Sequence, residues 1–287
     1  MATNNQTGII AGKQAANAAN AVAEAKKLTF SAFIGNDRTQ KAIMNTLQDA
    51  ARTKTFTSSL ISAVTTNPQL RECDGTSIIS AALLGESLNL SPSPQLGHYY
   101  MVPFKDTKTG TVKAQFQLGW KGYYQLALRS GQYKNIDAVA IKEGELISFN
   151  PITGSVELKP IEDPVERENA KTIGYYAFFE MINGFRKEMY WSREKMQAHA
   201  MKYSQGYKAQ KGYTFWEKDF DGMALKTMYR QLISKYGIMS IEMQKAYVND
   251  MAVHNSIDAT DTPEYIDADV TEDVFDVDPA TGEVVDG

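Results

Sequence analysis

The chain has 287 residues, of which 43% are hydrophobic, enough to bury a core in one domain or two lobes. It has no run of about 18 apolar residues, no charged N-terminal region followed by an apolar stretch, and one cysteine, so we expect a cytoplasmic protein without membrane span, secretory signal or internal disulfide. The formal net charge of -4 conceals an asymmetry: residues 258–287 hold eleven of the 34 acids and no base, which leaves 23 acids against 30 bases, or +7, in residues 1–257.

The first third of the chain is predicted to be mainly helical. Residues 1–35 begin with an Ala, Asn and Gln rich stretch, and we expect a flexible segment there. From Asn36 to Asn89 apolar residues recur at helical spacing and predict three helices, with Pro68 and Asp74 marking the break before the third. A loop with two prolines follows at 91–94.

The middle of the chain changes to the alternation of β-strands. Residues 99–104 and 112–118 flank a turn and predict a β-hairpin, whose second strand places Lys113, Gln115 and Gln117 on a polar face. A short helix is predicted from Trp120 to Leu128. Further strands are expected at 137–141, 146–149, 156–159, 172–182 and 185–191, the last two joined by Asn183-Gly184, a pair favoured in type I′ turns.

The last third is predicted to be helical again. Ser192 can cap a helix to about Tyr203, and a loop rich in glycine, bases and aromatics follows at 204–215. Helices are expected at 216–236 and 240–253, before an acidic, disordered tail at 258–287. The order predicts an α+β fold with a central antiparallel sheet and a packed helix, an N-terminal helical lobe and C-terminal helices, all within residues 36–257.

Motifs for covalent chemistry are missing from the sequence. No Gly-rich cradle followed by Lys and Ser or Thr is present, so an ATP-driven recombinase or helicase is disfavoured, and no nucleophile elbow or paired-His zinc motif occurs. Glu157 and Lys159 lie two apart on one predicted strand, as in a metal-dependent nuclease, but a solvated strand face explains them as well. We therefore expect no catalytic residue, no bound metal and no ATP, with magnesium at most modulating DNA binding.

Bases interleaved with aromatics are the positive signal for function. Such residues cluster at 99–113, 120–129 and 202–218, and single-strand binding needs cations along phosphates with aromatic faces for bases. The alternatives are that the aromatics belong to the core and that the bases of the helix at 216–236 form an ordinary exposed face. The candidate DNA-binding residues are Lys105, Lys108, Lys113, Gln115, Gln117, Lys121, Tyr124, Arg129, Lys202, Tyr207, Lys208, Lys211, Tyr213, Phe215, Lys226, Arg230 and Lys235.

Several motifs resemble the RecT family of phage and prophage single-strand DNA annealing proteins, related in fold to Redβ-type proteins. They are YYMVPF at 99–104, FQLGWKG at 116–122, LALRSG at 126–131, GMALKT at 222–227 with Arg230, and SIEMQKA at 240–246. The chain departs from the family pattern at Phe215, where a proline commonly precedes the tryptophan, and at Gly237, where Leu-Pro is common. These differences affect the expected loop geometry more than the assignment.

The resemblance implies ATP-independent binding and annealing of single-stranded DNA in homologous recombination. It also implies a ring or helical filament with a continuous basic groove, acting in a bacterial host on single strands and annealed duplex. A companion phage exonuclease and the host single-strand binding protein are the implied partners. A metal-dependent nuclease and a purely structural phage oligomer stay open as alternatives. Degradation of DNA with magnesium would favour the nuclease, and a failure to bind single-stranded DNA at low salt would favour the structural oligomer.

Overall fold

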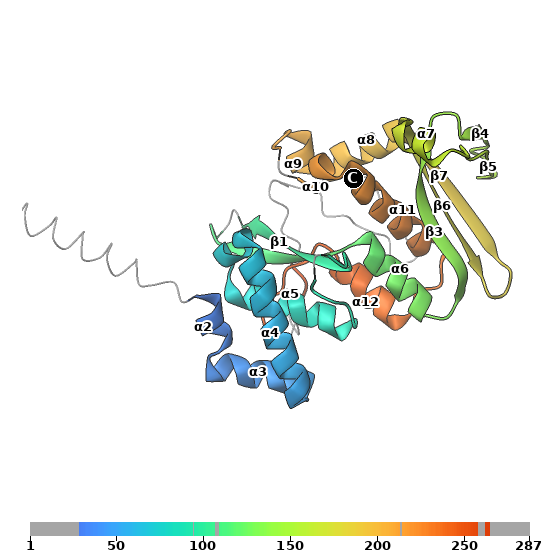
Figure 1. The fold of residues 1–287 in the computed structure, drawn as a ribbon. Helices are drawn as coiled ribbons and strands as arrows, with labels where there is room; N and C mark the ends of the chain where they lie inside the picture. Colours follow the sequence, from blue (N-terminus) through green and yellow to red (C-terminus); the bar gives the residue numbers. More distant parts are fainter. Residues whose placement is uncertain (1–28, 94, 107–108, 213, 258–261, 265–287) are drawn as a thin grey trace, which may run out of the picture.

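A computed structural model of the chain describes residues 29–93, 95–106, 109–212, 214–257 and 262–264 (Figure 1). Its first lobe contains α2 (Phe30–Ile34), α3 (Asp37–Leu47), α4 (Ala50–Thr66), the 3-10 helix η1 (Pro68–Glu72) and α5 (Gly75–Ser87). The three helices predicted between residues 36 and 89 are thus confirmed. Side chains of Asn36, Asp49 and Asp74 accept hydrogen bonds from the first turns of α3, α4 and α5, which explains where each helix begins.

The ordered structure begins before residue 36. Helix α2 lies inside the segment 1–35, for which a flexible chain is expected, and its Ile34 is completely buried. Residues 1–28 lie outside the described residues, as does the predicted tail apart from residues 262–264. Glu264 in that short piece pairs with Val253 in an antiparallel bridge.

The predicted hairpin of the first lobe is confirmed as β1 (Tyr99–Lys105) and β2 (Val112–Leu118), an antiparallel pair in register from Tyr99 opposite Leu118. Helix α5 packs against β2, and all of its residues from Ser77 to Gly85 are buried. A segment from far along the chain lines the hairpin, because Met251 N donates to Phe116 O and Phe116 N donates to Ala252 O. The lobe is therefore completed by residues from the end of the domain.

The central antiparallel sheet is also confirmed, with strand order β3 (Tyr133–Lys142), β6 (Thr172–Met181) and β7 (Arg186–Ser192). A separate small hairpin pairs β4 (Leu146–Phe149) with β5 (Val156–Leu158), followed by α7 (Pro164–Asn169). The turn between β6 and β7 differs from the type I′ prediction. Gly184 has a φ of 86° but Asn183 has no positive φ, and Gly184 N donates to Met181 O, so the loop has three residues.

The remaining helices are α6 (Trp120–Arg129), α8 (Arg193–Tyr203), α9 (Gln205–Lys208), α10 (Phe215–Lys218), α11 (Phe220–Tyr236) and α12 (Ile241–Asn249). Helix α11 packs on all three strands of the sheet and on α6, and Figure 1 shows it crossing the sheet with α8 near one end. The single helix predicted at 216–236 is wrong, because Asp219 leaves the helical region and caps α11 instead. None of the helices among the described residues is long and apolar enough to cross a bilayer.

Candidate nucleic-acid interface

Basic side chains from two helices gather on one surface, which we name the α8–α11 surface: Lys195, His199 and Lys202 of α8 with Arg230 and Lys235 of α11. The α8 residues follow one another at helical spacing and share one side of the helix. Burial and the charge of Lys235 lower the pKa of Lys195. Burial and the charges of Arg230 and Lys202 lower the pKa of His199 to about 4. The charges of Lys235 and Arg230 on α11 thus act on Lys195 and His199 on α8.

The charge of this surface is largely uncompensated. No carboxylate among the described residues forms an ion pair with Lys195, Lys202 or Lys235. All three lysines are exposed. A cluster of unpaired cations attracts a polyanion, and neutralising phosphates there releases counterions.

Aromatic rings lie beneath the cations. The Lys195 ammonium lies 4.6 Å from the centre of the Trp191 ring and the Lys202 ammonium lies 5.3 Å from that of Tyr203. The His199 ring contacts both of these rings, with centroid distances of 5.5 and 4.4 Å. Proteins that bind single strands combine cations along the phosphates with aromatic side chains, and both kinds of residue are present here.

Sequence reasoning included Lys202, Arg230 and Lys235 from this surface but missed Lys195, His199 and Trp191. The spacing of Lys195, His199 and Lys202 along one predicted helix was the available signal. Bases and aromatics do not alternate along this helix, so the pattern that predicts the other candidates does not include it. Trp191 ends a strand and meets Lys195 only after the chain has turned into α8.

A buried ionic cluster lies next to this surface, centred on Asp250. The Asp250 carboxylate is completely buried and accepts hydrogen bonds from Lys226 Nζ at 3.0 Å, Arg230 Nη1 at 2.6 Å, Leu118 N at 2.8 Å and Tyr123 Oη at 3.1 Å. Burial alone would raise the pKa of Asp250, but the charges of Lys226 and Arg230 outweigh it and lower the pKa. Asp250 is therefore an ionised carboxylate at the junction of β2, α6 and α11.

The two predicted cations of this cluster have different positions. Lys226 is 8% exposed and its pKa is lowered by burial, so the structure places it in the core rather than on the phosphate-facing ridge expected for it. The side chain of Arg230 is 29% exposed, and its guanidinium lies 4.3 Å from the centre of the Tyr247 ring. Of the pair, Arg230 alone keeps access to solvent.

The polar face of β2 is covered by the chain itself, which differs from the expected open face. Gln115 is 2% exposed and donates to the carbonyl of Met251, and Gln117 donates to the side-chain oxygen of Gln115 at 2.8 Å. Lys113 lies 3.4 Å from Asp106 and 3.5 Å from Glu264. Lys105 is exposed at the end of β1, and Lys108 lies outside the described residues.

The candidates on α6 are two exposed cations, of which one is bound to α5, and a half-buried tyrosine. Lys121 is exposed, with its ammonium 5.6 Å from the centre of the Trp120 ring. Tyr124 is half-buried against Tyr229. Arg129 donates to the carbonyl of Leu88 at 2.7 Å and to that of Asn89 at 3.2 Å. Arg129 therefore stabilises the C-terminal end of α5, a role that the interleaving of bases and aromatics could not reveal.

The loop at 204–215 contains both core and surface residues. Tyr207 packs between Trp216 and Phe220, with ring centroids 6.3 and 6.1 Å away. Phe215 is 41% exposed and lies 5.8 Å from the ring of Tyr100. Lys208 and Lys211 are exposed, and Tyr213 lies outside the described residues.

The pair Glu157 and Lys159 gains no metal-binding neighbours. Glu157 accepts a hydrogen bond from Ser148 across the β4–β5 hairpin. Within the part of the chain that the structure describes, no group of three or more His, Cys, Asp or Glu side chains is placed to hold a metal ion. Nothing in the described structure therefore favours the nuclease alternative.

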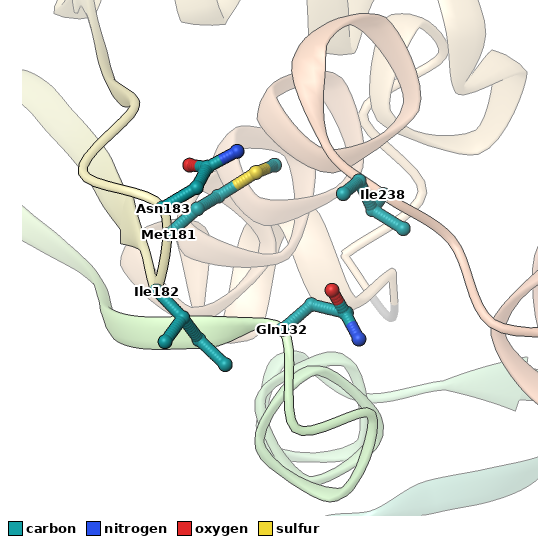
Figure 2. A pocket seen from close by; sticks show the side chains of 5 residues that line it. All are labelled: Gln132, Met181, Ile182, Asn183 and Ile238. Atoms are coloured by element: carbon teal, nitrogen blue, oxygen red, sulfur yellow. The ribbon is translucent and has the colours of Figure 1, made fainter.

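A pocket of about 320 Å³ lies at the end of the central sheet. Figure 2 shows Gln132, Met181 and Ile238 around it, contributed by the start of β3, the end of β6 and the turn after α11, and Ile182 and Asn183 complete the lining. A larger cavity of about 710 Å³ between α3 and α5 is lined by Arg38 and Thr76, among others. Neither cavity contains a candidate DNA-binding residue, so the basic surface and the cavities are separate features.

Comparisons with known proteins agree with the motifs. The model of the RecT family matches residues 54–264. The protein YqaK of Bacillus subtilis strain 168 is 42% identical over 221 residues, which cover 76% of this chain and 72% of YqaK. Protein RecT of Escherichia coli K12 is 32% identical over 197 residues, which cover 68% of this chain and 70% of that protein. The family match includes the α8–α11 surface and the Asp250 cluster.

Proposed function

Because this chain belongs to the RecT family, a family of single-strand DNA annealing proteins, we propose that it binds single-stranded DNA and pairs complementary strands in homologous recombination. Pairing proceeds in this proposal without nucleotide hydrolysis and without covalent catalysis. The absence of a phosphate-cradle motif in the sequence supports a mechanism driven by binding alone.

The α8–α11 surface is the observation that carries the proposal. Its exposed lysines have no carboxylate partner among the described residues, and two of them lie over aromatic rings. Cations that hold phosphates read no sequence and leave the pairing edges of the bases free. Annealing requires both properties, because the strand must be held while its bases search for their complement.

The finer parts of the proposal concern assembly and partners. We infer a homo-oligomer, a ring or a helical filament, that carries the α8–α11 surfaces of successive subunits along one DNA path. A companion exonuclease supplies the single strand in this scheme, host single-strand binding protein competes for it, and magnesium at most modulates binding. The reaction takes place in the cytoplasm of a bacterial host.

The test is an annealing assay with two labelled complementary oligonucleotides, with and without ATP. We expect equal rates of duplex formation in both, and a log affinity for single strands that falls linearly with log salt, by roughly 0.7 for each phosphate contact. A strict ATP requirement contradicts the proposal. Degradation of the oligonucleotides with magnesium would favour a nuclease, and absence of binding at low salt would favour a structural protein.

Two double variants test whether the α8–α11 surface binds single-stranded DNA. The double variant Lys195→Gln/Lys202→Gln should lower single-strand affinity at least tenfold. The matched control is Lys41→Gln/Lys54→Gln, which removes the same charge from exposed lysines of α3 and α4. Equal losses in the two variants would show that net charge, rather than this surface, determines binding.

A further inference from the structure

The Asp250 cluster contains one more positive charge than negative charge. Lys226 and Arg230 both form ion pairs with Asp250, and no other carboxylate among the described residues pairs with either cation. Asp250 and Lys226 are nearly inaccessible, at 2% and 8% exposure. Arg230 is only partly exposed, and a surplus charge with restricted access to water is costly unless an anion joins it.

Arg230 is the member of the cluster that an anion can reach. Its Nη1 is bound to Asp250, whereas no group in the described chain accepts a hydrogen bond from its Nε or Nη2. Among the described residues, every buried side-chain nitrogen or oxygen has a hydrogen-bond partner. Since Nε and Nη2 of Arg230 have none, these two atoms are accessible to solvent. The guanidinium also rests on the Tyr247 ring, so it is fixed from two sides while part of its edge faces solvent.

We propose that Asp250 is a positioning residue that holds Arg230 ready for a backbone phosphate of single-stranded DNA, and that this phosphate balances the surplus charge of the cluster. The inference rests on the proposed function. A planar guanidinium fixed before binding loses little rotamer freedom when it meets a phosphate, so the contact is tighter than that of a free arginine. The charges of Arg230 and Lys202 both lower the pKa of His199, and all three side chains belong to the α8–α11 surface.

The arginine is tested first. Arg230→Gln should lower the affinity for an oligothymidine at least tenfold and reduce the slope of log affinity against log salt by roughly 0.7, the loss of one phosphate contact. Lys54→Gln, an exposed lysine of α4, is the control for the loss of one charge. An Arg230→Gln variant that behaves like this control overturns the proposal.

The positioning role of Asp250 needs a variant that folds and keeps its net charge. Asp250→Asn alone leaves the buried Lys226 and the partly exposed Arg230 without a counterion and is expected to unfold easily. The double variant Asp250→Asn/Lys226→Met removes one acid and one base, so the net charge stays the same and one buried cation is gone. Arg230 remains in it but has lost its carboxylate.

For the folded double variant we expect a five- to tenfold loss of oligothymidine affinity, with the slope against salt close to that of the unmodified protein. If Asp250 serves stability alone, the folded variant will bind as tightly as the unmodified protein, and the proposal is overturned. If the unmodified protein itself fails to bind oligothymidine at low salt, the proposed function has failed rather than the role of Asp250. Unfolding curves for each variant define the folded fraction.

Discussion

Glu264, near the end of the described chain, lies 3.5 Å from the ammonium of Lys113 on β2. The same residue pairs with the backbone of Val253 and accepts a hydrogen bond from Asn255 at 2.9 Å. Glu264 of the acidic stretch is thus attached to the body, and it contacts a lysine that the sequence predicted as a DNA contact. Whether the acids beyond it compete with DNA is a separate question that truncation can answer.

Two C-terminal truncations should differ in their melting temperatures. Removing residues 265–287 keeps Glu264 and should leave the melting temperature unchanged, while raising single-strand affinity most at low salt, where screening is weakest. Removing residues 258–287 also deletes the Val253–Glu264 pairing, and should lower the melting temperature by about 2 to 4 °C for each kcal/mol lost. Thermal unfolding and DNA affinity across a salt series measure both effects. Equal affinities of all three chain lengths at low salt would exclude competition by the tail.

Replacing Lys208 and Lys211 by alanine should weaken binding to all single-stranded sequences by a similar factor, at least threefold. Both lysines are exposed near the short helix α9, so the folded core should be unaffected. Affinities for several oligonucleotides of different sequence provide the measurement, with Lys41→Ala/Lys54→Ala as the control of equal charge. Unchanged affinity in a folded double variant would exclude this loop from the interface.

Met251 adopts a left-handed backbone conformation with a φ of 71°, which turns the chain from α12 back onto β2. Met251→Asn should have a free energy of unfolding within about 0.5 kcal/mol of that of the unmodified protein, because asparagine tolerates the left-handed region. Met251→Val should lower it by about 1 to 2 kcal/mol, because a branched Cβ clashes there. Urea denaturation of the three proteins measures the difference, and equal stability of the valine variant would contradict this explanation.

The half-buried His199 makes stability depend on pH. Its pKa is about 4 in the folded protein against 6.5 for the free side chain, so between these values the unfolded chain binds more protons. Stability should be complete above pH 6.5 and fall as the pH decreases toward 4, by at most about 3 kcal/mol from this residue. Chemical denaturation at pH 7.5 and 5 measures the loss. His199→Phe should lose less stability over that range, and an equal loss would assign the pH dependence to other groups.

The elements of the fold that carry local signals could be predicted from the sequence. The capping residues Asn36 and Asp74 and the alternation in β2 act within a few residues, so their helices and strand appear as predicted. The break at Asp219 could not be predicted from apolar spacing, because the spacing continues across it. The short helix α7 lacks buried residues, so it has no periodic apolar signal.

The site was harder to predict because charge pairing is long-range. From the sequence Lys226 and Arg230 are expected on an exposed ridge, but both bind Asp250, which lies 24 and 20 residues further along the chain. Arg129 meets the carbonyls of Leu88 and Asn89, some 40 residues earlier. Composition identifies such residues as basic, but only the tertiary structure shows which of them already have partners.

The attachment of residues 250–256 to the first lobe has a consequence for synthesis of the protein. Leu118 N donates a hydrogen bond to Asp250, which is synthesised 132 residues later, and the Ser80 hydroxyl donates to the carbonyl of Ser256. At ribosomal rates of roughly 5 to 20 residues per second, the exposed edge of β2 stays without this partner for about 7 to 26 seconds. Because Asp250 arrives last, a nascent or prematurely ended chain cannot fix Arg230. A chain that ends before residue 250 lacks the carboxylate to which Arg230 is bound in the folded protein.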